Sequence, residues 1–255
     1  MTAEQLISFA RGAPSLDIVD VAGLKAAAAR AFDADPAGMT AYGTSVGYLP
    51  LRQWIADKHA VAPEQVIVTN GSLQADAFLF NHLVQAGDDV VVHASSFTKT
   101  VCPGVRVGYL VGPAALIDAI AKKATNLYIS PGMVSEAIVH QFCVSGDIDR
   151  SIATVSAALG ERAAVLAEAI REHIPGATFI EPDGGYFLWV DLPSDVDVDK
   201  LFPVAAKKGV AIVKGSDFLI DGGHHSVRLA FSATTVDQIR EGVRRLAEAI
   251  DEVRS

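Results

Sequence analysis

The chain has 255 residues, of which 50% are hydrophobic and 20% are charged, and its formal net charge is −9 at pH 7. This length and composition suffice for a substantial buried core, as one large domain or two small ones. The acidic balance argues against a general nucleic-acid-binding or anionic-membrane surface. Cys102 and Cys143 are too few for a disulfide framework or a cysteine-built zinc site, so we expect a reduced, cytoplasmic protein.

The residue pattern in the first part of the chain predicts an extended arm, a helix and an irregular segment. The start lacks the basic segment and apolar run of a signal peptide, and no uncharged apolar run is long enough to cross a bilayer. Residues 7–15 are expected to form an extended arm, because Gly12 and Pro14 interrupt regular structure. An alanine-rich helix is predicted over 20–32. An irregular segment then leads to Pro50, which suits a first helical turn.

A turn of small polar residues follows the apolar strand predicted over 66–69. Asn70, Gly71 and Ser72 lead from this strand into a helix that continues to residue 84. A strand, a glycine turn and a helix start present free backbone N–H groups and the positive helix end to an anion. The pattern predicts a phosphate-type site without specifying its ligand. The nucleotide-binding patterns Gly-x-x-x-x-Gly-Lys and Gly-x-Gly-x-x-Gly are absent from the sequence.

The next segment, after a short strand predicted over 90–92, combines a lysine with phosphate-binding residue types. Lys99 lies among hydroxyl residues, and Arg106 enters a strand-like run over 105–111. Guanidinium and hydroxyl groups bind phosphate. A nearby cation disfavours the ammonium form of Lys99, so its neutral amine could form a Schiff base with a carbonyl. These features suggest pyridoxal 5'-phosphate. They also fit a surface loop with Lys99 solvated and Arg106 paired to a carboxylate, and the local pattern leaves both interpretations open.

The second half of the chain alternates helices with short strands. Ser130 and Pro131 have the residue types of an N-cap and a first helical position, and Thr235 with Gln238 forms a capping box for the last helix. The aromatic residues of the strand over 186–190 are interpreted as core. The predicted helices cover 113–128, 130–145, 147–173 and a final segment from 235, and the predicted strands cover 177–180 and 186–190.

Arg228 stands inside an otherwise apolar strand near the C-terminal end. Burial of a guanidinium costs free energy unless it is paired, so we expect an anionic partner for Arg228. His224 and His225 precede it as neighbours in sequence. An extended segment would point them to opposite sides, which makes them a poor chelating pair, and we interpret them as loop or rim residues.

Several of these motifs resemble those of class I/II (fold type I) PLP-dependent aminotransferases, in the aminoadipate aminotransferase and MocR-like branch. They are a Phe-x-x-Gly-x-Pro segment beginning at Phe9, a Tyr-Gly-x-x-x-Gly-x-x-x-Leu-Arg segment beginning at Tyr42, and the Gly-Ser-x-Gln-Ala turn beginning at Gly71. Ser-Phe-Thr-Lys-Thr followed by Pro-Gly-Val-Arg-Val-Gly-Tyr resembles the family's Schiff-base lysine segment. The strings Gly-Gly-Tyr-Phe-Leu-Trp-Val-Asp-Leu-Pro and Arg-Leu-x-Phe-Ser follow in family order.

The resemblance implies roles for individual residues. Lys99 would be the catalytic residue that carries the cofactor. Arg228 would bind the α-carboxylate of the substrate, beneath the arm at Gly12. The cofactor phosphate would be bound by Ser72, the backbone of Leu73, Ser96 and Arg106, and by Tyr42 reaching across a homodimer.

The chain also departs from the family pattern between the predicted strand over 90–92 and Ser95. Relatives would carry several more strand–helix units there, including an aspartate that keeps the cofactor ring nitrogen protonated, so that the ring accepts electrons. No aspartate in a matching motif is found in the sequence. Asp88, Asp89 or His93 could replace it, although charges in such turns are more often solvated. Removing central strands would leave new sheet edges to be paired or hidden.

The sequence therefore predicts an α/β protein resembling the PLP-transferase fold type I. We expect an arm and helix (1–36), a shortened PLP-binding domain with a parallel-type sheet (37–165) and a small α+β C-terminal domain (166–255). The expected function is a cytoplasmic, homodimeric aminotransferase acting on an amino acid and a 2-oxo acid, without nucleic-acid or membrane partners or a metal. The alternative is a PLP-binding remnant that is catalytically impaired or regulatory.

Overall fold

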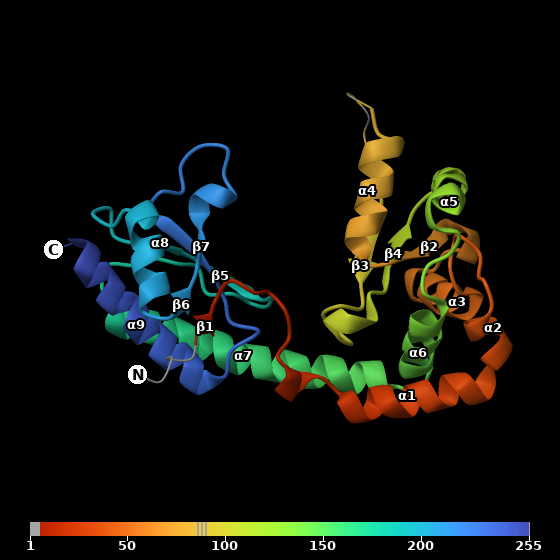
Figure 1. The fold of residues 1–255 in the computed structure, drawn as a ribbon, viewed down its shortest axis with the longest axis horizontal. Coiled ribbons are helices and arrows are strands. Elements are labelled where there is room, and N and C mark those ends of the chain that lie inside the picture. Colours follow the sequence, from red (N-terminus) through yellow and green to blue (C-terminus); the bar gives the residue numbers. More distant parts are fainter. Residues whose placement is uncertain (1–5, 86, 88, 90, 255) are drawn as a thin grey trace. The chain divides into compact units, whose positions relative to one another are not determined.

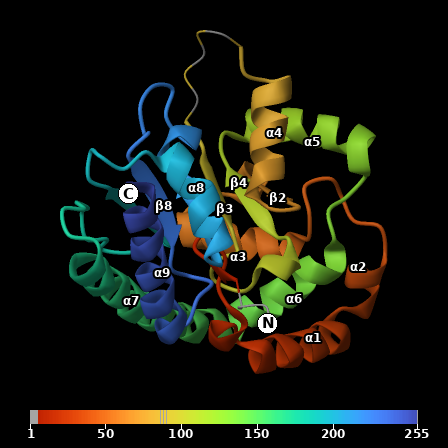
Figure 2. The same cartoon turned by 60° about the vertical axis from the view of Figure 1, so that its left-hand side comes forward.

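The computed structural model describes residues 6–85, 87, 89 and 91–254 (Figures 1 and 2). Its α-helices are α1 (Val21–Ala34), α2 (Pro36–Thr40), α3 (Leu49–His59), α4 (Ser72–His82), α5 (Ala114–Tyr128), α6 (Met133–Val144), α7 (Asp147–His173), α8 (Val198–Lys207) and α9 (Val236–Arg254). Its strands are β1 (Ile7–Ser8), β2 (Val66–Thr69), β3 (His93–Ser96), β4 (Gly108–Val111), β5 (Phe187–Asp191), β6 (Val210–Ala211), β7 (Val213–Lys214) and β8 (Ser226–Ala230).

The chain forms two compact units. Unit 1 combines the N-terminal residues up to Ile18 with the residues from Thr154 onward, and unit 2 comprises Val19–Ala153. The long helix α7 begins in unit 2 and continues in unit 1. The domain boundaries expected at residues 36 and 165 remain a prediction.

Unit 2 is built on a three-stranded sheet in the order β2–β4–β3 (Figure 2). Both strand pairs are antiparallel: Thr69 and Ser96 each lie opposite Gly108 of the central strand. The expected parallel pairing is therefore wrong for this sheet, because β4 runs against both neighbours. The outer strands point the same way, and a sequence pattern of buried strands does not reveal the direction of the strand inserted between them.

Helices cover both faces of this sheet. Alternation along β2 directs Ile67 to one face, where it packs with Leu110 and residues of α4 and α5. Val66 and Val68 point to the other face and pack with α1, α3 and α6. Ser96 and Gly108 share the face that carries α4, whereas His93 shares the opposite face with Val111. The side of the sheet on which each candidate residue lies thus follows from strand register.

Three local predictions were wrong. The strand before the lysine is His93–Ser96; Val91 and Val92 lie outside any strand, and Val90 lies outside the described residues. Helix α6 begins at Met133 after an N-cap at Gly132, rather than at Ser130 and Pro131. Residues 177–180 form no strand, because only Thr178 makes an isolated bridge, to Asp191. The start of β3 follows from its pairing with β4, which local residue types do not specify.

Unit 1 contains the antiparallel sheet β5–β8–β7 and the short parallel pair β1–β6. Its core includes Leu188 and Val190 of β5 and Val227 and Leu229 of β8, packed with residues of α7, α8 and α9. The N-terminal arm belongs to this core through Phe9, which is fully buried. The backbone N–H of Ala230 donates to the carbonyl oxygen of Phe9 at 2.6 Å, which holds the arm beside β8.

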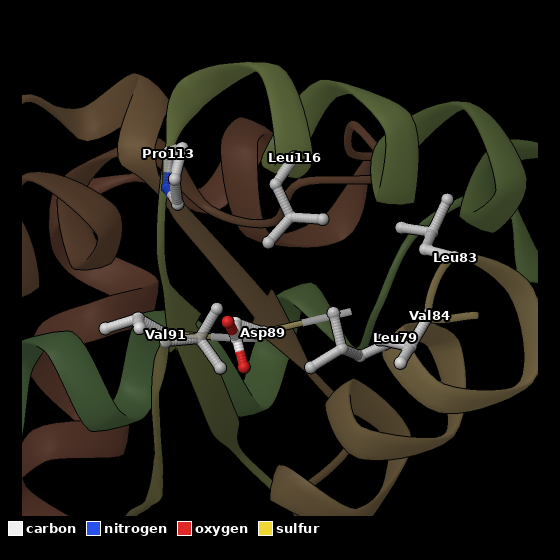
Figure 3. Close-up of a pocket in the computed structure, with 8 residues that line it drawn as sticks. Leu79, Leu83, Val84, Asp89, Val91, Pro113 and Leu116 are labelled. Atoms are coloured by element: carbon white, nitrogen blue, oxygen red, sulfur yellow. The ribbon is translucent and has the colours of Figure 1, made fainter. Parts of the chain in front are cut away.

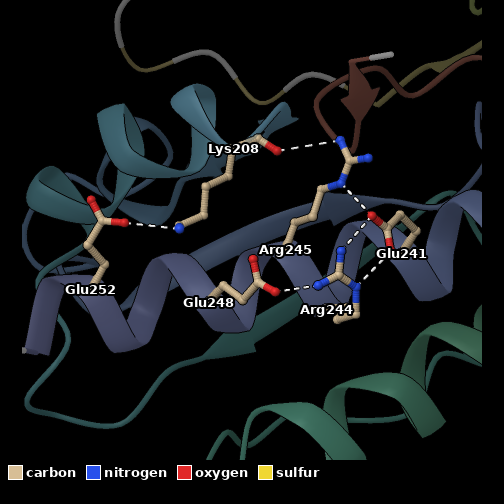
Figure 4. Close-up of polar contacts among 6 residues, drawn as sticks. All are labelled: Lys208, Glu241, Arg244, Arg245, Glu248 and Glu252. Carbon is tan, nitrogen blue, oxygen red and sulfur yellow. Dashed lines mark hydrogen bonds and ion pairs between the residues drawn. The ribbon is translucent and has the colours of Figure 1, made fainter. Parts of the chain in front are cut away.

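Helix α9 combines a buried face with an ion-paired outer face (Figure 4). Arg244 and Arg245 both contact Glu241, and Arg244 also contacts Glu248. Such pairs stabilise an exposed helix by a few tenths of a kcal/mol each. The predicted capping box opens this helix: Gln238 N–H donates to Thr235 Oγ1 at 3.3 Å, and Thr235 N–H donates to Gln238 Oε1 at 3.0 Å. Among the described residues, no helix is long and apolar enough to cross a membrane.

Candidate active site

The turn between β2 and α4 has the form of an anion-binding site. Gly71 precedes the helix with φ +85° and provides no side chain to cap it, so the first backbone N–H groups of α4 remain available to a ligand. A Cβ on Gly108 would lie 2.3 Å from the backbone nitrogen of Ser72, so only glycine lets the helix start approach β4 this closely. The sheet thus holds the positive end of α4 against its surface.

Arg106 closes this turn from the other side. Its backbone is left-handed, with φ +52°, directly after the short 3₁₀ helix Pro103–Val105. The side chain returns over the turn and donates from Nη2 to the carbonyl oxygen of Asn70 at 3.2 Å. A Cβ on Gly71 would lie 2.3 Å from the same Nη2, and the φ of +85° at Gly71 is what favours glycine here. The guanidinium is exposed, which leaves it available to an anion.

Ser96 completes the set of phosphate-binding groups predicted for this unit. It lies opposite Gly108 in the register, on the sheet face that carries α4. We name Gly71, Ser72, Ser96, Arg106 and Gly108 the anion cradle. Three predicted phosphate contacts, Ser72, Ser96 and Arg106, are thus grouped around Gly71 and Gly108. The fourth, Leu73, lies in the first turn of α4. The Leu73 side chain itself is exposed, so the backbone is the part of this residue that can serve an anion.

Lys99 lies on a turn that follows Ser96 and is anchored on both sides. Phe97 and Val101 are buried, and Val101 N–H donates to the carbonyl oxygen of Phe97 at 2.8 Å. Ser151 Oγ donates to the carbonyl oxygen of Thr100 at 2.6 Å. Burial lowers the pKa of the Lys99 ammonium below its usual value. We predicted this direction from the charge of Arg106, but desolvation is the cause that operates in the structure.

Tyr42 begins a segment that is packed tightly onto the start of α6. A Cβ on Gly43 would lie 2.2 Å from the sulfur of Met133, and Tyr48 N–H donates to Glu136 Oε2 at 2.6 Å. Tyr42 itself is 89% exposed. The segment is therefore fixed while the tyrosine ring is left free of the core, and a contact of Tyr42 with a partner chain remains a prediction.

Arg228 lies on the non-core face of the unit 1 sheet, between two aromatic rings. Its Cζ is 4.1 Å from the ring centroid of Phe187 and 4.3 Å from that of Phe218. Its Nε is buried and has no hydrogen-bond partner within the described part of the chain. The expected anionic partner is therefore not supplied by the described residues, and the guanidinium can bind an external anion.

Gly12 contacts one of these rings. A Cβ on Gly12 would lie 2.1 Å from Cζ of Phe187, so the arm and the ring are in direct contact. Phe187 is 36% exposed, which corrects our assignment of this aromatic residue to the core. Sequence reasoning also missed Phe218, which follows the 3₁₀ helix Gly215–Asp217. The available signal was alternation along the strand: Phe187 and Trp189 share the face of Arg228, because Trp189 lies opposite Arg228.

Two residues considered as replacements for the ring-nitrogen aspartate lie elsewhere. His93 packs against His59, with ring centroids 4.6 Å apart, on the sheet face opposite to the cradle. Asp89 lines an apolar cavity of about 250 Å³ with Leu79 and Leu83, beside the last turns of α4 (Figure 3). The cradle lies at the first turn of α4, roughly 10 Å or more away along the helix. Asp88 lies outside the described residues.

Comparison with known proteins identifies the family. Residues 94–246 match the family model described as "Aminotransferase class I and II". This match covers more than half of the chain. The chain belongs to the class I and II aminotransferases.

The relatives of this aminotransferase chain include enzymes and regulators. It is 32% identical over 176 residues to a 2-aminoadipate transaminase of Thermus thermophilus. The alignment covers 68% of this chain and 44% of the relative. It is 33% identical over 163 residues to the HTH-type transcriptional regulator TauR of Rhodobacter capsulatus, covering 63% of this chain and 34% of the relative. The chain therefore spans less than half the length of these relatives.

Solved structures agree on the fold of this aminotransferase chain. The α-aminoadipate aminotransferase LysN of Thermus thermophilus, complexed with N-(5'-phosphopyridoxyl)-L-leucine, superimposes with a TM-score of 0.88 at 19% identity. The superposition covers 97% of this chain and 92% of LysN. The predicted PLP-transferase fold is confirmed by this likeness. The family match supports pyridoxal 5'-phosphate as the cofactor. The phosphopyridoxyl ligand belongs to LysN itself.

The residues of this aminotransferase chain fit the phosphate of that cofactor. Gly71 and Gly108 let the first turn of α4, strand β4 and the guanidinium of Arg106 approach one another closely, because a Cβ at Gly108 would overlap Ser72 N and a Cβ at Gly71 would overlap Arg106 Nη2. Phosphate oxygens are suited to backbone N–H groups, a hydroxyl and a guanidinium in this combination. The cradle thus fits a phosphate on the chemistry of its donors and on their close approach to one another.

Proposed function

We propose that the chain is a PLP-dependent aminotransferase that acts on an amino acid and a 2-oxo acid. The observation that carries the proposal is the anion cradle together with Lys99. Lys99 is partly desolvated and lies three residues after Ser96 in the sequence. A phosphate site beside a lysine with a lowered pKa is the combination that a phosphorylated aldehyde cofactor requires. The family match supports the same activity.

Each group of residues has a distinct task in this proposal. When bound, pyridoxal 5'-phosphate supplies an aldehyde and an electron-accepting ring. Ser72, Ser96 and Arg106 hold its phosphate, together with the backbone of Leu73. Lys99 Nζ is the nucleophile toward the aldehyde carbon and, as a neutral amine, takes the proton from the substrate Cα. Burial lowers the pKa of Lys99, which favours this neutral form.

Arg228 orients the amino-acid substrate by its α-carboxylate. The guanidinium forms no ion pair among the residues that the structure describes, and its buried Nε has no hydrogen-bond partner there. A carboxylate can accept two parallel hydrogen bonds from such a guanidinium. Gly12 contributes to the same site from the arm, because it contacts Phe187 beside Arg228.

We further propose that the active form is a cytoplasmic homodimer. Tyr42 is held by a fixed segment but is 89% exposed, which leaves its hydroxyl available to the cofactor phosphate of a partner chain. The net charge of −9 gives no general attraction to nucleic acid or to anionic membranes. We retain the expected domains, with boundaries near residues 36 and 165, as part of the proposal.

The test is a titration of the purified protein with pyridoxal 5'-phosphate, followed by its visible spectrum. We expect a lysine-dependent band that is absent from Lys99→Ala, whereas Lys123→Ala, which removes an exposed lysine of α5, keeps it. A panel of amino acids should then convert the band to the pyridoxamine form, with release of the 2-oxo acid. No lysine-dependent band would overturn the proposal.

The second candidate is a PLP-binding protein that is catalytically impaired or regulatory. Two observations favour it: neither Asp89 nor His93 lies at the cradle, and TauR, a relative over part of its length, is a transcriptional regulator. It predicts the same lysine-dependent band, with no conversion by any amino acid. The amino-acid panel therefore separates the two functions on a single sample.

A further inference from the structure

Arg228 is enclosed by two aromatic rings that come from separate parts of unit 1. Phe187 lies on β5, and Phe218 follows the 3₁₀ helix after β7. Both ring centroids lie within 4.3 Å of Cζ of Arg228. The two phenyl rings form no ring contact with each other among the described residues, so the guanidinium separates them. Cζ of Arg228 lies over both rings, and their π-systems attract the cation.

A carboxylate would reach this guanidinium along its edge. Nε is buried without a hydrogen-bond partner in the described part of the chain. Hydrogen bonds from a guanidinium lie in its plane, and two parallel ones match the two oxygens of a carboxylate. The two ring contacts thus favour one position of the guanidinium over positions in solvent.

The position of each ring is itself determined by a neighbour. Gly12 abuts Phe187, where a Cβ would lie 2.1 Å from the ring, and the arm is held beside β8 through the Ala230–Phe9 hydrogen bond. Phe218 packs edge-on against Trp189, with ring centroids 6.2 Å apart and an interplanar angle of 75°. Each ring thus has a neighbour in the fold, Gly12 for Phe187 and Trp189 for Phe218.

We propose that Phe187 and Phe218 are positioning residues for the α-carboxylate of the substrate, and that Gly12 acts through Phe187. The inference rests on the proposed function and deepens it. The clamp, defined as Phe187, Arg228 and Phe218, selects ligands with a planar carboxylate that can enter along the guanidinium edge. Gly12 is then not a direct substrate contact but the residue that sets the position of one ring.

The experiment measures binding rather than turnover. The cofactor-free protein is titrated calorimetrically with N-(5'-phosphopyridoxyl)-L-leucine and with N-(5'-phosphopyridoxyl)-3-methylbutylamine, which lacks only the carboxylate. Both probes offer the same phosphate to the cradle, so the ratio of their affinities isolates the carboxylate contribution. In the wild type we expect a preference of about 10- to 100-fold for the carboxylate probe, the range for hydrogen bonds to charged groups. Arg228→Met should abolish this preference.

The ring variants then test the clamp. Phe187→Leu and Phe218→Leu should each reduce the preference about three- to tenfold, as expected for loss of one cation–π contact. Their affinity for the amine probe should stay unchanged. Phe202→Leu, which removes a similarly exposed phenylalanine from α8, should leave the preference unchanged. Phe187→Tyr keeps the ring, and it should restore the preference and exclude a general packing effect.

The possible failures are distinguishable. If neither probe binds, the proposed function fails, and the assignment of a substrate carboxylate to this clamp fails with it. If both probes bind and the two leucine variants keep the full carboxylate preference, the proposed function stands and the clamp is overturned. Thermal unfolding of each variant is measured beside the titrations. If Phe187→Leu does not fold, the carboxylate preferences of Phe187→Tyr and Gly12→Ala are compared instead.

Discussion

The carboxylate of Glu136 accepts a hydrogen bond from the backbone N–H of Tyr48 at 2.6 Å, although Glu136 is only 1% exposed. Its other oxygen, Oε1, is buried and has no partner among the described residues. Glycine at position 47 permits this approach, since a Cβ there would lie 2.7 Å from Oε2. This contact joins α6 to the segment that carries Tyr42.

Burial of Glu136 should make the stability of unit 2 decrease as the pH rises from about 4.5 to about 8. Desolvation raises the pKa of Glu136 to about 8 from 4.5, although the Tyr48 hydrogen bond and the charge of Arg52 act in the opposite direction. The folded protein thus retains a proton that the unfolded chain releases. The corresponding stability is complete below pH 4.5 and is lost as pH rises through 8.

Thermal unfolding between pH 6 and 9 measures this effect. Each pKa unit corresponds to about 1.4 kcal/mol, so we expect the wild type to lose a few kcal/mol of unfolding free energy over the range. Glu136→Gln, which cannot ionise, should flatten the decline. Glu161→Gln, at an exposed position of α7, should follow the wild type. An equal decline in Glu136→Gln would assign it to other groups.

The glycine at position 108 should be essential for cofactor binding. In Gly108→Ala the new Cβ would lie 2.3 Å from the backbone nitrogen of Ser72, and backbone cannot yield as a flexible side chain can. We expect about 1–3 kcal/mol of lost stability and at least about tenfold weaker binding of pyridoxal 5'-phosphate. Gly104→Ala is the control, because nothing lies within 4 Å of its Cβ position. Spectroscopic titration gives both affinities, and similar values for the two variants would contradict this description of the cradle.

Lys99 should react with aldehydes at lower pH than an exposed lysine. Its pKa is lowered by burial, so its neutral amine is populated at a pH where solvated lysines are still protonated. Reductive trapping with pyridoxal 5'-phosphate and borohydride at pH 7 to 10, read by peptide mass spectrometry, compares Lys99 with the exposed Lys123. We expect labelling of Lys99 to reach its plateau at the lower pH. Arg106→Gln separates reactivity from phosphate binding, since pyridoxal without phosphate should label Lys99 equally in this variant and in the wild type.

Tyr42 should act only within a dimer. Because the side chain is 89% exposed, Tyr42→Phe should leave the stability of the single chain unchanged. Loss of a hydrogen bond to a phosphate should weaken pyridoxal 5'-phosphate binding by about tenfold or more. Mixing Tyr42→Phe chains with Arg106→Gln chains then tests the partner contact. A mixed dimer has one site with both residues intact, so it should regain tight binding at one site, whereas contacts within one chain would give no recovery.

Elements that are determined by neighbouring residues in the sequence can be predicted from the sequence. The long helix α7 covers 147–173 as expected, and the capping box of Thr235 and Gln238 opens α9. The Gly71 turn and the lysine segment are visible in the sequence, because a phosphate site built on a helix start needs a short, contiguous pattern. Their grouping in one unit could be expected only from the family resemblance.

Other features depend on contacts between residues far apart in the sequence. The placement of β3 at 93–96 and its antiparallel pairing with β4 result from register between strands, which local residue types do not specify. The aromatic clamp required Phe187, Phe218 and Arg228 to come together from separate elements, and the cause of the Lys99 pKa shift required knowledge of burial. The sequence by itself thus determined the family, the helices and the candidate groups of the site. Only the tertiary structure decided on which face of a sheet each group lies, which aromatic ring contacts it and how deeply it is buried. These properties depend on packing energies summed over distant parts of the chain.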